Sequence, residues 1–157
     1  MSGSEIPHVE IRRAAPADFA AVCALLKQAQ LPTEDLTPNA MARFQVAHRN
    51  GQMIGTVGFE PLAHNAALVR SLVVDPGFRG RGLGERLFAE IESVCREQRI
   101  RTLFLLTNSA VPFFLSLGFS ELPRDQVPQS VRGTAEFRSL CPAGAVCMSR
   151  LLEAQYD

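Results

Sequence analysis

The chain has 157 residues and a mass of 17.2 kDa, a length that fits one domain over residues 1–157. Apolar residues make up 46% of it, which is typical of a globular protein and excludes a disordered or fibrous one. Sixteen basic residues balance sixteen acidic ones, so no overall positive charge favours nucleic acid or an anionic membrane as a partner.

The sequence shows neither a membrane span nor a disulfide framework. No apolar run approaches the ~20 residues of a membrane helix, and Met1–Glu10 has no hydrophobic signal core, so we expect a cytoplasmic protein. Cys23 and Cys95 lie among apolar residues on predicted helices and are expected to be buried thiols. Cys141 and Cys147 lack zinc-ligand spacing, so we predict no metal site; a disulfide or a bound metalloid between them is the weaker alternative.

The chain begins with a predicted strand and a predicted helix. Residues 9–15 alternate between apolar and polar side chains, which favours a strand. Pro16 and Asp18 then open a helix. One face of this helix carries its apolar residues, namely Phe19, Val22, Leu25 and Leu26. Residues 31–40, with two prolines, predict a loop, with or without one helical turn.

A β-hairpin is predicted next. Asn50-Gly51 favours a tight turn between strands over residues 43–49 and 52–60. Residues 61–65 are expected to turn the chain. Residues 66–74 are apolar on both faces, which predicts a central strand.

Helices and strands then alternate. Residues 82–98 predict a helix, and residues 102–107 form a continuous apolar run typical of a buried strand. A short helix over 110–117 is expected to end at Gly118, and Phe119 to begin a sixth strand. The long helix has an apolar stripe that consists of Leu83, Leu87, Phe88, Ile91, Val94 and Cys95.

The last part of the chain is less regular. Residues 124–144 contain two prolines and no clean period, so we expect a loop and a short helix. Residues 145–152 predict a seventh strand. A hairpin followed by strand–helix–strand units indicates an α/β (α+β) fold, a mixed sheet with helices on both faces.

The segment from Leu72 to Gly84 carries the strongest functional signal. A buried strand leads into a glycine-rich turn, and the turn leads directly into a helix. Free backbone N–H groups and the positive end of the helix dipole would converge there, which predicts an anion site suited to a pyrophosphate. The turn has neither the Gly-Lys-Ser/Thr of a P-loop nor the GxGxxG spacing of a dinucleotide site. It contains Arg79, Gly80, Arg81, Gly82 and Gly84.

This segment resembles the GCN5-related N-acetyltransferase (GNAT) superfamily. The family loop Gln/Arg-x-x-Gly-x-Gly/Ala is matched by Arg79, Gly82 and Gly84, and the preceding Leu-x-Val by Leu72 and Val74. A later family motif, Ala-x-x-Phe-Tyr-x-x-x-Gly-Phe, is matched by Ala110, Phe113, Gly118 and Phe119. The two motifs stand in the family's order and cover about half the chain.

The resemblance implies a fold, a co-substrate and a chemistry. It implies a GNAT sheet of about seven strands that splays between the fourth and fifth, acetyl-CoA as co-substrate without a metal, and direct attack of an amine on the thioester. A backbone N–H near Leu72 or Val74 would polarise the carbonyl. The implied coenzyme A residues are Leu72, Val73, Val74, Arg79, Gly80, Arg81, Gly82, Leu83, Gly84, Thr107 and Phe114.

Two positions depart from the family pattern. Phe114 stands where the family usually has a tyrosine that can protonate the leaving thiolate, and the only tyrosine of the chain is Tyr156. Thr107 stands at the family's common asparagine, with Asn108 one place out of register. The first departure also favours an alternative function, a non-catalytic acyl-CoA-binding module.

Further segments resemble the small bacterial arsenic-resistance N-acetyltransferases, which are themselves similar to short N-acetylglutamate synthases. This second resemblance runs from about residue 54 to 152 and includes FFLSLGF at 113–119 and Leu140-Cys141-Pro142. It implies a small amino-acid-like acceptor, with N-acetylglutamate synthesis as an alternative. Homodimers are common in the superfamily.

The residues around the central strand suggest how such an acceptor would bind. Arg70 and Ser71 alternate along the predicted strand, so only one is expected to face the acceptor. A buried Arg70 needs a carboxylate, which is either that of the substrate or that of Glu60. Glu60 is the candidate general base, with His64 as the alternative. An acceptor lid, or else a solvated loop, is predicted for the segment that carries Arg132, Thr134 and Glu136.

Overall fold

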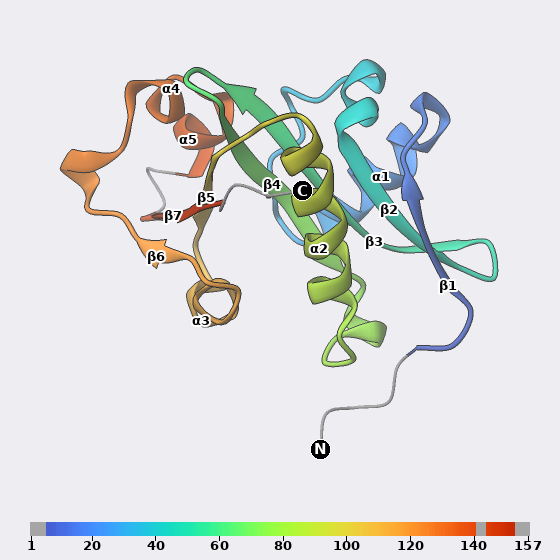
Figure 1. Ribbon diagram of the computed structural model, residues 1–157. Helices are drawn as coiled ribbons and strands as arrows, with labels where there is room; N and C mark the ends of the chain where they lie inside the picture. The colour runs from blue at the N-terminus through green and yellow to red at the C-terminus, as the bar shows by residue number, and fades with distance from the viewer. Residues whose placement is uncertain (1–5, 141–143, 153–157) are drawn as a thin grey trace. The chain divides into compact units, whose positions relative to one another are not determined.

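The computed structural model describes residues 6–140 and 144–152 (Figure 1). Seven strands form one mixed sheet in the order β1-β2-β3-β4-β5-β7-β6, which confirms the predicted α/β fold class. The chain divides into two compact units. The first comprises Met1–Phe59 and Ser71–Val94, and the second comprises Glu60–Arg70 and Cys95–Asp157.

The first unit contains an antiparallel arrangement of β1 (Val9–Arg13), β2 (Phe44–Arg49) and the start of β3 (Gln52–Leu62). Asn50 and Gly51 both have positive φ, 51° and 80°, which is the geometry of a tight hairpin turn. The Asn-Gly prediction is therefore confirmed. A register shift between Ala47 and His48 interrupts the β2–β3 ladder.

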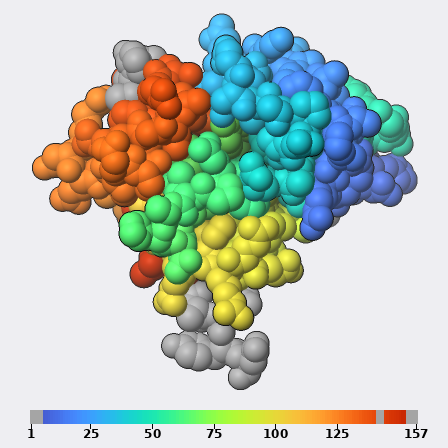
Figure 2. Space-filling view, turned by 90° about the horizontal axis from the view of Figure 1, so that it is seen from above, coloured from blue at the N-terminus to red at the C-terminus, as the bar shows by residue number. Residues whose placement is uncertain are grey.

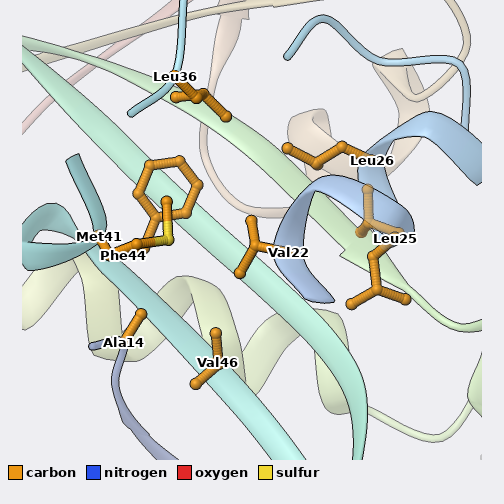
Figure 3. Packing of buried hydrophobic residues seen from close by; sticks show 9 residues of the cluster. Ala14, Val22, Leu25, Leu26, Leu36, Met41, Phe44 and Val46 are labelled. Atoms are coloured by element: carbon orange, nitrogen blue, oxygen red, sulfur yellow. The ribbon is translucent and has the colours of Figure 1, made fainter. Parts of the chain in front are cut away.

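A hydrophobic core covers one face of these strands. The short 3-10 helix η1 (Pro16–Asp18) leads into α1 (Phe19–Gln28), and η2 (Pro38–Arg43) supplies the helical turn expected before β2. Figure 3 shows α1 directing Val22 toward the strands, where Phe44 and Met41 lie side by side. The buried members of this core are Ala14, Val22, Leu25, Leu26, Leu36, Met41, Phe44, Val46 and Val73.

An ion pair fastens the start of α1 to β1. Arg12 donates to both carboxylate oxygens of Asp18, at 2.8 and 3.0 Å, and Asp18 also accepts the backbone N–H of Ala15 at 2.7 Å. The hydrogen bonds from Arg12 are the main reason that the pKa of Asp18 is lowered to about 2. The end of β1 and the helix entry are thereby held together.

The other face of the first unit is covered by α2 (Leu83–Glu97), as the predicted stripe requires (Figure 1). The helix packs closely here, because a Cβ added at Gly55 would lie only 2.8 Å from the Leu87 side chain. Gly55 pairs with Ala47 across the hairpin, one residue out of phase with the Val46–Thr56 pair, so it faces away from the α1 core. Helices therefore pack on both faces, as predicted.

The second unit contains the end of β4 (Ala66–Val74) that pairs in parallel with β5 (Thr102–Thr107). The parallel register joins Ala66–Leu68 to Thr102–Phe104 and stops there, although β5 continues to Thr107. On its other side β5 pairs antiparallel with β7 (Val146–Leu151) along its whole length. The sixth strand, β6 (Ser120–Glu121), is only two residues long.

Helical turns fill much of the segment that we expected to be a loop. After α3 (Val111–Ser116) and β6 come η4 (Arg124–Gln126), α4 (Gln129–Arg132) and α5 (Ala135–Leu140). These turns cover a second hydrophobic core. Its buried members are Ala66, Leu68, Phe104, Leu106, Val127, Val131, Leu140 and Cys147.

In each unit, a stretch of residues that are close in sequence forms part of the surface. Figure 2 shows the residues of α1 and η2, blue to cyan, as one continuous surface of the first unit. It likewise shows residues from about 125 to 140, orange to red, as a continuous surface of the second unit.

The predicted turn over residues 61–65 is partly wrong. β3 runs on through Pro61 to Leu62, and the turn is confined to the next three residues. His64 and Asn65 have positive φ, 64° and 58°, as in a tight turn between antiparallel strands. A proline is tolerated near the end of a strand, where its missing N–H costs no ladder hydrogen bond.

The cysteines follow the predictions in part. Cys95 is buried as predicted, whereas Cys23 is only half-buried. Cys147 is a buried thiol, and burial raises its pKa to about 11, so it is not a thiolate nucleophile near neutral pH. Cys141 lies outside the described residues, so its relation to Cys147 is not part of the structure.

Residues 6–140 and 144–152 contain neither a membrane-spanning helix nor a cluster of metal-ligating side chains. None of the helices there has both the length and the apolar character needed to cross a bilayer. No three His, Cys, Asp or Glu side chains gather there as a metal-binding group.

A prediction about stability concerns Gly58, which lies directly opposite Phe44. A Cβ at Gly58 would lie 2.5 Å from the Phe44 ring, whose residue is 1% exposed. We expect Gly58→Ala to lower the free energy of unfolding by about 1–3 kcal/mol, because the buried ring cannot move away. Urea denaturation measures this difference.

Gly133→Ala is the matched control. Gly133 has a helical φ of −80°, and its added Cβ would meet only a backbone oxygen at 3.4 Å. We expect its stability to change by no more than about 0.5 kcal/mol. When Phe44→Leu is added to Gly58→Ala, the double variant should recover part of the lost free energy of unfolding, because the smaller side chain leaves room for the added Cβ. Wild-type stability in Gly58→Ala would contradict this account of the hairpin.

Candidate active site

The glycine-rich turn of the first unit begins from a firmly held base. After β4 ends at Val74, the Asp75 carboxylate accepts the N–H of Gly77 at 2.9 Å, and η3 (Pro76–Phe78) follows. The Asp75 N–H donates to Ile54 O at 2.8 Å. Arg79 donates through Nε to Val74 O at 3.0 Å, so its side chain folds back toward the strand end.

Two of the glycines need the conformational freedom that the sequence suggested. Gly80 and Gly82 have φ of +74° and +83°, a region that L side chains rarely adopt. Apart from the two residues next to it in the chain, no described residue has a heavy atom within 4 Å of the place that a Cβ of residue 80 would occupy. Leu83 begins α2, so Gly84 lies in the first turn of that helix. The turn therefore ends at the N-terminus of a 15-residue helix, where unpaired N–H groups favour an anion.

The expected alternation along β4 is wrong at Ser71. Ser71 has φ +62°, which interrupts the extended backbone, so the two-residue period does not continue across it. Arg70 and Ser71 are both buried, at 4% and 5% exposed. Beyond the interruption Val73 packs in the first unit's core, whereas Leu72 and Val74 are half-buried.

Three charged residues gather in the second unit around β4. Arg70 Nε lies 3.0 Å from Glu136 Oε2, and the two side chains are 2% and 4% exposed. Arg70 Nη1 lies 3.8 Å from Glu60 Oε1, whose side chain is 35% exposed. Arg70 is therefore paired mainly with Glu136, and Glu60 is the more accessible acid.

Sequence reasoning named Glu136 as a lid residue but missed this pairing. Glu136 lies on α5, and nothing in its local sequence distinguishes it from the exposed acids nearby. Its neighbour Thr134 is also buried, and the Thr134 hydroxyl donates to Val131 O at 2.7 Å and accepts the Phe137 N–H at 3.1 Å. The solvated-loop alternative is therefore wrong for Thr134 and Glu136.

Arg132 has a different environment. It is exposed, and its Nε and Nη2 donate to the carbonyls of Val127 and Arg124 at 3.0 and 2.6 Å. It braces the segment before α4. His64 is exposed in the β3–β4 turn.

A cavity of about 290 Å³ lies elsewhere in the second unit. Leu106, Leu122, Phe137 and Cys147 supply apolar walls, and Glu121 and Arg124 are its charged lining residues. None of the predicted acceptor residues lines it, so we do not assign it to the acceptor.

The sequence comparisons decide the family. Residues 40–121, just over half of the chain, match the model of the acetyltransferase (GNAT) domain. The chain belongs to this family. The GNAT fold prediction is thereby confirmed, and the sheet order described above is the GNAT arrangement of this chain.

Individual relatives are similar over part of their length. An uncharacterized N-acetyltransferase of Chlorobaculum tepidum is 35% identical over 89 residues, 56% of either chain. An amino-acid acetyltransferase of Ectopseudomonas mendocina is 28% identical over 97 residues, 61% of this chain but 22% of that protein. The chain thus spans about half or less of the curated relatives that it matches.

Solved structures show the same fold. N-acetylglutamate synthase from Neisseria gonorrhoeae, complexed with coenzyme A and N-acetyl-glutamate, superposes with a TM-score of 0.81 at 24% identity, over 95% of this chain and 36% of that one. A Mycobacterium tuberculosis protein in complex with CoA gives 0.77 at 22% identity, over 92% of this chain and 99% of that one. At these identities the likeness establishes the fold.

The two positions that depart from the GNAT pattern both have structural contacts in the second unit. The Thr107 hydroxyl accepts the N–H of Ala110 at 3.0 Å, which helps α3 begin. The Phe114 ring is 7% exposed and packs edge-on against Phe113 and Phe119, with ring centroids 5.1 and 5.8 Å away. Their roles toward coenzyme A stay predictions.

Phe114→Tyr tests whether this GNAT domain needs the family's usual hydroxyl. The ring contacts are the same for tyrosine, so we expect the variant to fold and its turnover to stay within about threefold of wild type or to rise. Steady-state thiol release at saturating substrates measures this, and Phe113→Tyr is the control on the neighbouring ring. A severe loss of turnover in a folded Phe114→Tyr protein would mean that the apolar ring itself is required.

Proposed function

We propose that this GNAT domain transfers an acetyl group from acetyl-CoA to the amine of a small amino acid or a close analogue. The observation that carries the proposal is Arg70, a buried cation on the central strand that has one buried and one accessible carboxylate beside it. The names of the relatives, amino-acid acetyltransferase and N-acetylglutamate synthase, support an acceptor of this class. No metal is included in the proposal.

The proposed coenzyme A site uses the turn of the first unit. N–H groups of Arg79–Gly84 would bind the pyrophosphate, with the arginine charges beside it. The positive φ of Gly80 and Gly82 and the helix that starts at Leu83 support this assignment. The remaining proposed contacts are those of Leu72, Val73, Val74, Thr107 and Phe114.

The proposed reaction is a direct acyl transfer. Acetyl-CoA supplies a thioester whose C–S bond breaks, with loss of the CoA thiolate, as the acceptor nitrogen forms its bond to the carbonyl carbon. A backbone N–H near Leu72 or Val74 would stabilise the developing oxyanion. Glu60 would take a proton from the acceptor ammonium, directly or through water, so that the free amine can attack. The second N–H proton leaves to water or to the CoA thiolate as the amide forms. Glu60 suits this role because it is the more accessible acid of the cluster.

Charge supports this role of Glu60. Two carboxylates and one guanidinium carry one negative charge in excess when all are ionised, which favours a cation such as the acceptor ammonium nearby. Glu136 and Arg70 are both buried and lie within ion-pair distance, so Glu60 is the acid that an incoming amine can reach. The acceptor carboxylate is proposed to meet Arg70 first, with Ser71 and Arg132 as further contacts. Because the Arg70 side chain is 2% exposed and already paired with Glu136, this contact requires the guanidinium to be shared between Glu136 and the acceptor carboxylate.

The cofactor site is tested by a charge placed in the turn. Gly82→Asp should weaken acetyl-CoA binding by at least about tenfold relative to Gly82→Asn, because both side chains have the same size and asparagine tolerates positive φ, whereas only aspartate repels phosphate. Calorimetric titration with acetyl-CoA measures both affinities. Equal affinities in the two folded variants would remove the basis of the proposed pyrophosphate site.

The acceptor class is tested by a substrate panel. It should contain glutamate, other amino acids, amino-acid antimetabolites including arsenic-containing analogues, and the matching decarboxylated amines. We expect kcat/KM for the preferred amino acid to exceed that for its decarboxylated amine by about ten- to a hundredfold, the worth of a charge-assisted contact. Activity with glutamate alone would favour the synthase alternative. Equal activity toward simple alkylamines would contradict the proposal, and binding without thiol release would favour a non-catalytic module.

Substitutions in the cluster of Arg70, Glu60 and Glu136 distinguish the proposed roles of these residues. Arg70→Gln/Glu136→Gln removes the buried pair without leaving a lone charge, and should raise the acceptor KM by about ten- to a hundredfold with little change in the acetyl-CoA KM. Glu60→Gln should lower kcat at pH 7 and less at high pH, where the free amine is abundant. The controls are Arg101→Gln and Glu97→Gln, exposed residues of the second unit. An unchanged acceptor KM in the folded double variant would make Arg70 purely structural.

A further inference from the structure

A cation–aromatic contact lies directly before the proposed pyrophosphate turn, within the first unit. The guanidinium carbon of Arg49 lies 5.7 Å from the centroid of the Phe78 ring. This distance is within the range in which a cation is attracted to an aromatic face. Phe78 immediately precedes Arg79, the first residue of the turn.

The backbone of Phe78 is fixed from the side of β4. Its N–H donates to Asp75 O at 2.8 Å, one bond of the short η3 helix. The Asp75 side chain holds the neighbouring Gly77 N–H at 2.9 Å. The Phe78 ring is half-buried, and its contact with Arg49 attaches the end of η3 to a second element.

Arg49 is itself held in place. It is the last residue of β2, directly before the Asn50–Gly51 turn, and its partner across the hairpin is Gln52. Its Nε donates to Pro7 O at 3.1 Å. The half-buried guanidinium therefore bridges the chain segment before β1 and the Phe78 ring.

The turn that follows needs such an anchor. Gly80 and Gly82 lack the side chains that restrict a backbone, and ordering glycine on binding costs more conformational entropy than ordering any other residue. A turn whose first residue is already fixed loses less entropy when its N–H groups converge on a phosphate. The restraint from Arg49 acts on Phe78, the residue directly before the turn.

We infer that Arg49 is a positioning residue for coenzyme A binding, which acts through the Phe78 ring on the turn Arg79–Gly84. The inference rests on the proposed role of that turn. It assigns to the tip of the β2–β3 hairpin a part in co-substrate affinity, although neither Arg49 nor Phe78 belongs to the glycine-rich motif.

The first test measures acetyl-CoA affinity by calorimetric titration without an acceptor. We expect Arg49→Ala to raise the Kd about two- to fivefold, the worth of one partly exposed cation–aromatic contact, and Arg49→Lys to recover part of this loss. The control is Arg13→Ala, which removes the same charge from an exposed position on β1 of the same unit. An equal rise in Arg13→Ala would attribute the effect to net charge and overturn the inference.

A double-mutant cycle tests the route through the ring. Phe78→Leu should raise the Kd by a similar factor, and Arg49→Ala should add little in that background. At saturating acetyl-CoA, kcat and the acceptor KM should remain within about twofold of wild type. A raised Kd for acetyl-CoA together with an unchanged kcat and acceptor KM is a pattern that general destabilisation would not produce. Additive effects in the cycle, or an unchanged Kd in folded Arg49→Ala, would overturn the inference.

The Gly82→Asp variant distinguishes a wrong role of Arg49 from a wrong assignment of the pyrophosphate site. If Gly82→Asp and Gly82→Asn bind acetyl-CoA equally well, the turn is not the pyrophosphate site and the inference falls with it. If Gly82→Asp alone loses affinity and Arg49→Ala binds like wild type, only the positioning role of Arg49 is wrong.

Discussion

A permanent cation in the interior of the second unit constrains what can pack around it. Arg70 cannot lose its charge at any ordinary pH, and its side chain is 2% exposed, so a carboxylate must accompany it. Glu136 provides that carboxylate from α5, and the pair thereby connects a central strand to a short helix 66 positions later in the sequence. Loss of either partner alone would leave the other charge buried. The position of α5, which places Glu136 beside Arg70, meets this requirement.

Sequence predicted the regular elements well where one local signal dominated. The apolar run 102–107 became β5 with the same bounds, and Asn50-Gly51 formed the expected turn. Pro61 misled the prediction because a proline near a strand end resembles a turn signal. The segment 124–144 proved more helical than expected, since its helices are short and are stabilised by burial of residues such as Val131 and Leu140 rather than by a long apolar stripe.

The sequence motifs of the candidate site could be predicted, whereas the side-chain contacts within it could not. The glycine turn was visible because its residue types imply a backbone geometry, and Gly80 and Gly82 adopt it. The Arg70–Glu136 pair and the Arg49–Phe78 contact join residues that are 66 and 29 positions apart in the sequence. A local sequence pattern cannot predict contacts between residues so far apart. Motif positions also have structural contacts that the motif does not reveal, as Thr107 shows at the start of α3.

The backbone of Ser71 favours different residues from those that strands usually favour. Strands generally favour β-branched residues, but the left-handed φ of Ser71 disfavours valine, isoleucine and threonine there and is best tolerated by glycine or asparagine. Aspartate would bring a charge into a position that is 5% exposed. Substitutions that would improve the strand propensity of β4 would therefore damage its geometry at this residue. In a set of related sequences, or in a redesign guided by propensity, this position should drift among small polar residues while its neighbours on the same strand drift among aliphatic ones.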